Sequence, residues 1–162
     1  MDARRLLSTL TDALGRTTRR ALGGARAVTG RSPDAAPGPL VDVSEVDADE
    51  ALFLVRTMIA AASADGVVDA GERERLQAAM REAGLDPDDR SFLDEEIAWP
   101  RDIDEIADAV STPERAARTW AAARLVIAPD TMREREFLRL LAARMDLRPD
   151  EVAAIEARAG GR

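Results

Sequence analysis

The sequence predicts an all-α fold, a compact bundle of about seven helices, on the basis of composition and recurring helix-start signals. Ala, Leu, Arg and Glu dominate the composition, and these residues lose little side-chain freedom in a helix. Residues typical of strands are scarce, since the chain has no Tyr, three Phe and two Trp. With 162 residues, the chain is long enough for one domain with a buried core and an additional tail.

The first part of the chain is predicted to be a separate basic arm. Residues 3–14 place leucines at helical spacing and form a short amphipathic helix. Gly, Pro, Ser and Arg then dominate up to residue 39, which is the composition of a linker. We therefore divide the chain into a basic amphipathic arm with a flexible linker, residues 1–40, and a helical domain, residues 41–162.

Seven helices are expected inside this domain, because helix-start signals recur at regular intervals. Some begin at a capping residue, such as Asp47 or Thr131, and others carry proline in their first turn, such as Pro87 and Pro149. The predicted helices cover about 51–64, 69–83, 87–99, a short stretch from 102, 113–127, 131–145 and 149–159.

An internal repeat relates the two halves of the domain. An offset of 62 residues aligns Glu72–Leu76 with Glu134–Leu138, and Leu85–Asp88 with Leu147–Asp150. Each half then consists of a helix, a capped turn, a second helix and a third helix that starts with proline. We therefore predict a pseudo-twofold bundle of three-helix halves.

The composition excludes much of enzyme chemistry. The chain has no Cys and no His, and all 23 of its basic residues are Arg. Thiol nucleophiles, the usual general base near neutral pH and lysine Schiff bases are therefore absent. The sequence predicts a protein that is not an enzyme, and a carboxylate-dependent hydrolase ranks last among its interpretations.

Charge is unevenly distributed. Residues 1–31 hold seven arginines against two acidic residues, whereas the remainder holds sixteen against twenty-nine, within a net charge of −8. An acidic body would be repelled by a phosphate backbone, so nucleic acid is not an expected partner. No stretch is apolar enough to span a membrane, and no secretory signal is visible, so the expected location is the cytoplasm.

The arm suggests a second kind of contact, with an anionic membrane surface or with a protein partner. Its leucines and arginines have the arrangement of a helix that lies on such a surface. The alternatives are that this helix docks on the domain or stays disordered. The residues proposed for the contact are Arg4, Arg5, Leu6, Leu7, Leu10 and Leu14.

Acidic residues at two predicted helix junctions are candidate metal ligands. Asp65, Asp69 and Glu72 are spaced so that their carboxylates could meet at one helix start, and Asp130 with Glu134 could complete a shared site. Oxygen ligands suit Mg²⁺, Ca²⁺ or Mn²⁺ rather than zinc. The alternative is pure helix capping, and both roles are compatible because a capping carboxylate keeps spare lone pairs.

The stretch Met58–Glu72 contains Ala-Asp-Gly, followed after two residues by Asp and after two more by Glu. This pattern resembles the TerB-like (tellurite-resistance) superfamily. Further stretches, such as Trp99-Pro100 and Ile127–Thr131, resemble more specifically the domain-of-unknown-function family 533, its YebE-like branch. This resemblance implies an all-α bundle, a bacterial envelope or stress context and possible divalent-cation binding by acidic loops. It implies no established reaction.

These observations lead to two functional interpretations. In the first, the chain is a non-enzymatic TerB-like helical module that binds a divalent cation and acts in stress-linked sensing or scaffolding near the bacterial inner membrane. In the second, it is a metal-free scaffold that docks a basic protein partner on its acidic face. Trp99 and Trp120 are expected to serve in core or hinge packing.

Overall fold

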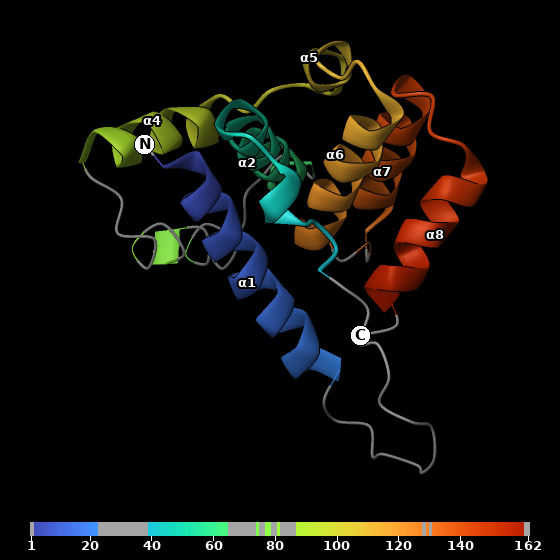
Figure 1. The fold of residues 1–162 in the computed structure, drawn as a ribbon, viewed down its shortest axis with the longest axis horizontal. Coiled ribbons are helices and arrows are strands. Elements are labelled where there is room, and N and C mark those ends of the chain that lie inside the picture. The colour runs from blue at the N-terminus through green and yellow to red at the C-terminus, as the bar shows by residue number, and fades with distance from the viewer. Residues whose placement is uncertain are drawn as a thin grey trace.

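The computed structural model describes residues 2–22, 39–64, 74, 77–78, 81, 87–127, 129 and 131–160. Within these residues the protein is an all-helical bundle without strands, which confirms the predicted fold class (Figure 1). The elements are α1 (Ala3–Leu22), the 3₁₀ turn η1 (Val43–Glu45), α2 (Ala48–Ala62), α4 (Pro87–Ala98), α5 (Ile103–Asp108), α6 (Pro113–Val126), α7 (Met132–Arg144) and α8 (Pro149–Gly160). Most of the helix predicted at 69–83 lies outside the described residues.

Helix starts follow the predicted capping signals. The Asp47 carboxylate accepts a hydrogen bond from the Glu50 N–H at 2.8 Å and begins α2. At Asp102 the cap is reciprocal, because the Glu105 side chain also accepts from the Asp102 N–H at 3.0 Å. Such caps satisfy backbone donors that the first turn of a helix leaves without partners.

The turn between α7 and α8 is tight. The Leu147 N–H donates to the Ala142 carbonyl at 3.0 Å, which closes the last turn of α7. Asp146 takes a left-handed conformation with φ of 54°, as a residue just past a helix end often does. Pro149 then begins α8, which diverges from α7 (Figure 1).

α2 and α6 form the centre of the bundle, and they pack against each other more extensively than any other pair of described elements. Leu54 and Met58 of α2 are fully buried, as are Ala122 and Ala123 of α6. α4 packs on α2, and α8 packs on α6, so the two halves of the predicted repeat use the same kind of contact.

Helix α1 belongs to this core. It packs along α2 and also contacts α6. Leu6, Leu7 and Leu10 lie in the same buried cluster as the apolar side chains of α2. The helix is also longer than the predicted 3–14, and the predicted boundary at residue 40 does not separate it from the domain. The linker composition suggested that this helix would be separate from the domain. Burial of its leucine face removes apolar surface from water, and this stabilises the packed arrangement instead.

A buried ion pair joins the two central helices. Glu50, in the first turn of α2, is only 7% exposed. Its Oε1 accepts a hydrogen bond from the Arg118 Nε of α6 at 2.7 Å. Because a charge in the interior is costly without a partner, this pair ties the start of α2 to α6.

Candidate interaction sites

The residues predicted to bind a cation lie mostly outside the described part of the chain. This holds for Asp65, Asp69, Glu72 and Asp130. Glu134 is described, and its carboxylate accepts a hydrogen bond from the Thr131 N–H at 2.8 Å, so it serves as a helix cap. Among the described residues, no group of three or more acidic, His or Cys side chains could hold a metal ion. The cation site therefore remains a prediction.

The residues predicted for membrane or partner contact fall into two groups. Arg4 and Arg5 are exposed, and the Arg4 guanidinium donates to the Ser44 carbonyl at 3.4 Å. Leu6, Leu7 and Leu10 are at most 2% exposed, so in this structure they contact the core. The side chain of Leu14 lies outside the described residues. Within the described part of the chain, no helix has the length and apolar character needed to cross a bilayer.

Trp99 is the most exposed of the large apolar side chains among the described residues. It is 85% exposed, so its predicted role in core or hinge packing is wrong, whereas Trp120 is 2% exposed and buried as predicted. The reason is local. The Trp99 N–H still closes the last turn of α4 on the Glu95 carbonyl at 2.9 Å, and Pro100 then turns the chain toward α5. The indole is left outside the bundle.

A hollow of about 500 Å³ lies between the end of α2, the start of α5 and α7. Pro100, the residue after Trp99, is part of its wall. Its apolar side chains come from three helices, and Leu140 among them is 37% exposed. They are Ala60, Ala64, Ile103, Phe137 and Leu140.

Exposed carboxylates of α4 and α5, together with the Asp102 cap, form a group that we call the acidic rim: Asp94, Glu95, Asp102, Asp104, Glu105 and Asp108. Asp102 and Asp104 of this group line the hollow. The acidic rim runs from the end of α4 through α5 along one edge of the molecule (Figure 1). Arg144 pairs with Asp104 at 2.6 Å, and it reaches Asp108 at 4.0 Å. Within the lining of the hollow, Asp102 and Asp104 stand against Arg101 and Arg144, and the other four acids of the rim lie outside this lining.

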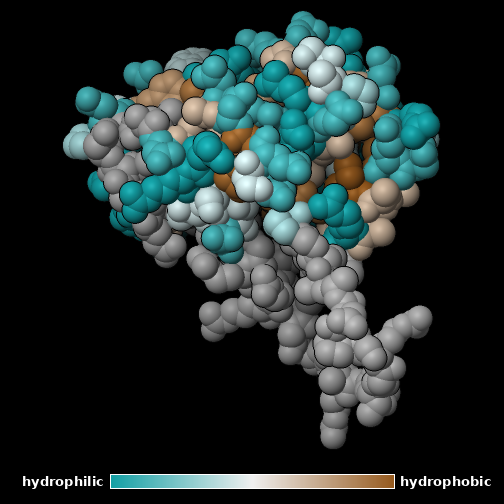
Figure 2. All heavy atoms as spheres, viewed as in Figure 1, coloured by the Kyte–Doolittle hydropathy of each residue, from teal (hydrophilic) through white to brown (hydrophobic). Residues whose placement is uncertain are grey.

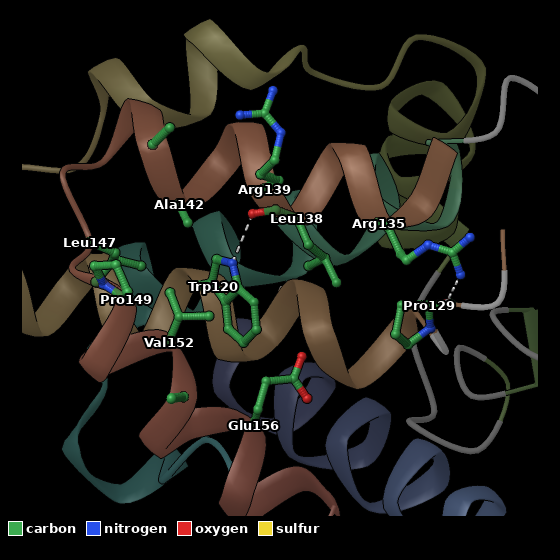
Figure 3. Close-up of a pocket in the computed structure, with 12 residues that line it drawn as sticks. Trp120, Pro129, Arg135, Leu138, Arg139, Ala142, Leu147, Pro149, Val152 and Glu156 are labelled. Atoms are coloured by element: carbon green, nitrogen blue, oxygen red, sulfur yellow. Dashed lines mark hydrogen bonds between the residues drawn. The ribbon is translucent and has the colours of Figure 1, made fainter. Parts of the chain in front are cut away.

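A second cavity, which we call the slot, lies between α6, α7 and α8 and has a volume of about 580 Å³. Trp120 of α6 forms its floor, and its Nε1 donates to the Leu138 carbonyl at 3.0 Å, which holds the ring in place (Figure 3). Most of the lining is apolar, and Figure 2 shows apolar atoms in a recess on the side where α8 lies. The apolar lining includes Leu138, Ala142, Leu147, Pro149 and Val152.

Comparison with known proteins identifies the family of the chain. A family model described as "Protein of unknown function (DUF533)" matches residues 8–159. The chain belongs to the DUF533 family. Neither the curated proteins nor the solved structures contain a match. The DUF533 region extends from within α1 to the end of α8, so the Trp99 hollow and the slot are both parts of the family domain.

The charges at the edges of the slot in this DUF533 protein differ from those of the acidic rim. Arg135 and Arg139 line it from α7, one helical turn apart. Arg139 pairs with Glu136 at 2.6 Å, and this hydrogen bond lowers the pKa of the Glu136 carboxyl below its ordinary value. On the α8 side, the Arg124 Nε donates to both carboxylate oxygens of Glu156, at 2.9 and 3.0 Å.

Proposed function

We propose that this DUF533 chain is a non-enzymatic interaction module that docks a basic protein partner on the Trp99 face. This face comprises Trp99, the hollow that Pro100 helps to line and the acidic rim. The observation that carries the proposal is an indole that is 85% exposed and is followed by Pro100, a wall residue of a partly apolar hollow, with exposed carboxylates on the neighbouring α4 and α5. The absence of Cys, His and Lys from the sequence further favours binding over catalysis.

The chemistry of this face indicates what the partner must provide. Trp is enriched among the residues that contribute most to protein interfaces, because it buries a large area with few rotatable bonds. The hollow accepts apolar side chains, as the grooves that bind amphipathic helices do. The acidic rim attracts positive charge and repels acidic partners. A helix that carries both leucine and arginine side chains meets all three conditions.

A labelled amphipathic peptide of Leu and Arg tests this function. We expect the intact chain to raise its fluorescence anisotropy, and we expect Trp99→Ala to weaken binding about thirtyfold, as loss of an interface anchor does. Reversing two charges of the rim, Asp94→Lys with Glu95→Lys, should weaken binding about tenfold, and added salt should weaken binding of the unmodified chain.

Two controls accompany the peptide experiment. Asp150→Lys reverses an exposed acid of α8 that is not part of the Trp99 face, and it should leave the affinity unchanged. A peptide in which Glu replaces Arg should not bind. Equal binding of the two peptides, or full affinity in Trp99→Ala, would contradict the proposed function.

Divalent-cation binding by the acidic loops is a second candidate, and with it a role in stress-linked sensing or scaffolding near the inner membrane. It is favoured by the position of Glu134 at the start of α7, since a capping carboxylate keeps lone pairs for an ion. At ten times its dissociation constant, Mg²⁺, Ca²⁺ or Mn²⁺ should add about 1.4 kcal/mol to the free energy of unfolding.

Thermal unfolding of the full chain measures this effect. The ion-dependent gain in the free energy of unfolding should disappear in the Asp65→Ala/Glu72→Ala variant. Unchanged melting of the parent chain with all three ions would leave these carboxylates with a capping role only.

A further inference from the structure

We propose that Arg144 is an internal competitor of the basic partner that docks on the Trp99 face. In the free chain its guanidinium holds the Asp104 carboxylate and lies near that of Asp108. Docking exchanges this guanidinium for an arginine of the partner. The inference rests on the proposed function, and it adds how the chain itself sets the affinity of that face.

Arg144 links the last turn of α7 to α5. Its Nε lies 2.6 Å from the Asp104 Oδ1, and its Nη2 lies 4.0 Å from the Asp108 Oδ1. The two aspartates are four residues apart in α5, so they lie on one face of this helix. Two carboxylates therefore meet a single guanidinium, and this group of three side chains keeps one negative charge.

Arg144 also decides how acidic the lining of the hollow is. The lining contains two acids, Asp102 and Asp104, and two arginines, Arg101 and Arg144. Arg101 belongs to a different ion pair, because its Nε lies 4.0 Å from the Glu96 Oε2 of α4. Arg144 is therefore the arginine whose departure exposes a carboxylate of the lining to a partner.

The exchange costs little because both members of the ion pair are exposed. The Arg144 side chain is 49% exposed, and that of Asp104 is 69% exposed. Ion pairs between exposed side chains contribute little to stability. Guanidinium groups form parallel hydrogen bonds with carboxylates, so an arginine of the partner suits the same place. Arg144 thus lowers the affinity of the Trp99 face without closing it.

Removing the charge of Arg144 should strengthen binding of the labelled peptide of Leu and Arg. In the full chain, Arg144→Gln is expected to lower the dissociation constant about threefold, because one exposed ion pair no longer competes. Arg144→Lys keeps the charge and should bind like the unmodified chain. Fluorescence anisotropy of the peptide measures the affinity. The three residues changed in these experiments, Arg133, Asp104 and Arg144, are exposed, so their variants should keep the fold.

Arg133→Gln is the matched control for net charge. Arg133 is exposed on α7 but does not line the hollow, so this variant changes the net charge equally and should leave the affinity nearly unchanged. An equal gain in Arg133→Gln would show an effect of net charge and would overturn the competition.

A second substitution tests whether Arg144 acts through Asp104. When Asp104→Asn is already present, Arg144→Gln should give a smaller gain in affinity, and an undiminished gain would contradict the proposal. Unchanged or weaker binding in Arg144→Gln would overturn this inference alone, provided that Trp99→Ala still weakens binding. If neither the unmodified chain nor Arg144→Gln bound the peptide, the proposed function would fail together with it.

Discussion

Replacing Leu6 by Ala is expected to lower the free energy of unfolding by about 3 kcal/mol. Leu6 is fully buried and belongs to the cluster that also contains the core residues of α2. Truncation removes apolar contacts and leaves a cavity, and both effects destabilise the folded state. Urea unfolding of the full chain, followed by circular dichroism, measures the change. It is among the largest effects that a single substitution should have in this protein.

Arg5→Ala is the matched control, because Arg5 is the neighbouring residue of α1 and is exposed. Its effect should stay within about 0.5 kcal/mol, as for other surface substitutions. If Leu6→Ala proved equally mild, α1 would be a separate arm, as the linker composition suggested, and not part of the core.

The burial of α1 also limits contact with a membrane. A helix lies on a membrane surface by placing its apolar face among the lipids. In this protein Leu6, Leu7 and Leu10 already face α2 and α6. Contact through these leucines would therefore require α1 to leave the core, at a cost comparable to that of several large-to-small substitutions. Arg4 and Arg5 can meet an anionic surface without this cost, because they are exposed.

Replacing Glu50 by Ala is expected to lower the free energy of unfolding by about 2 kcal/mol. Glu50 is 7% exposed, and its hydrogen bond from Arg118 is 2.7 Å long. Without the carboxylate, the Arg118 guanidinium is left partly buried beside α2 without its charged partner. Because the Arg118 side chain is 25% exposed, water compensates part of the loss, and the effect stays below that of a fully buried pair.

A double variant separates the ion pair from the packing. Glu50→Met with Arg118→Met removes both charges of the pair and keeps much of the side-chain volume, so it should recover part of the stability lost in Glu50→Ala. The recovery should be incomplete because Arg115, whose Nε lies 3.9 Å from the Glu50 Oε1, keeps its charge. Urea unfolding of the variants forms the test. If the double variant were as unstable as Glu50→Ala, packing around Glu50 would explain the loss better than the unpaired charge of Arg118.

The local signals in the sequence were sufficient to predict where most described helices begin. Asp47, Asp102 and Thr131 cap helices as expected, since a cap depends on side chains within three residues of each other. Pro113 and Pro149 begin helices for the same kind of reason, because their fixed backbone angle suits a first turn. The family was also predictable, since its motifs are contiguous stretches of sequence.

The candidate sites were less predictable. Trp99 and Trp120 are both isolated aromatic residues, and the sequence suggested a role in core or hinge packing for both. Their exposure differs because of tertiary packing. α7 and α8 cover Trp120, whereas nothing among the described elements covers Trp99. A signal was available for Trp99 in the proline that follows it, since Pro100 ends α4 and turns the chain away from the bundle.

The sequence by itself determined the all-helical class, most helix boundaries, the acidic charge and the family, because each depends on composition or on residues close together in the chain. The tertiary structure decided that α1 is part of the core, that Glu50 meets Arg118, and that α7 and α8 diverge around Trp120. These features depend on residues far apart in sequence, whose contacts form only when the helices pack their apolar faces against one another.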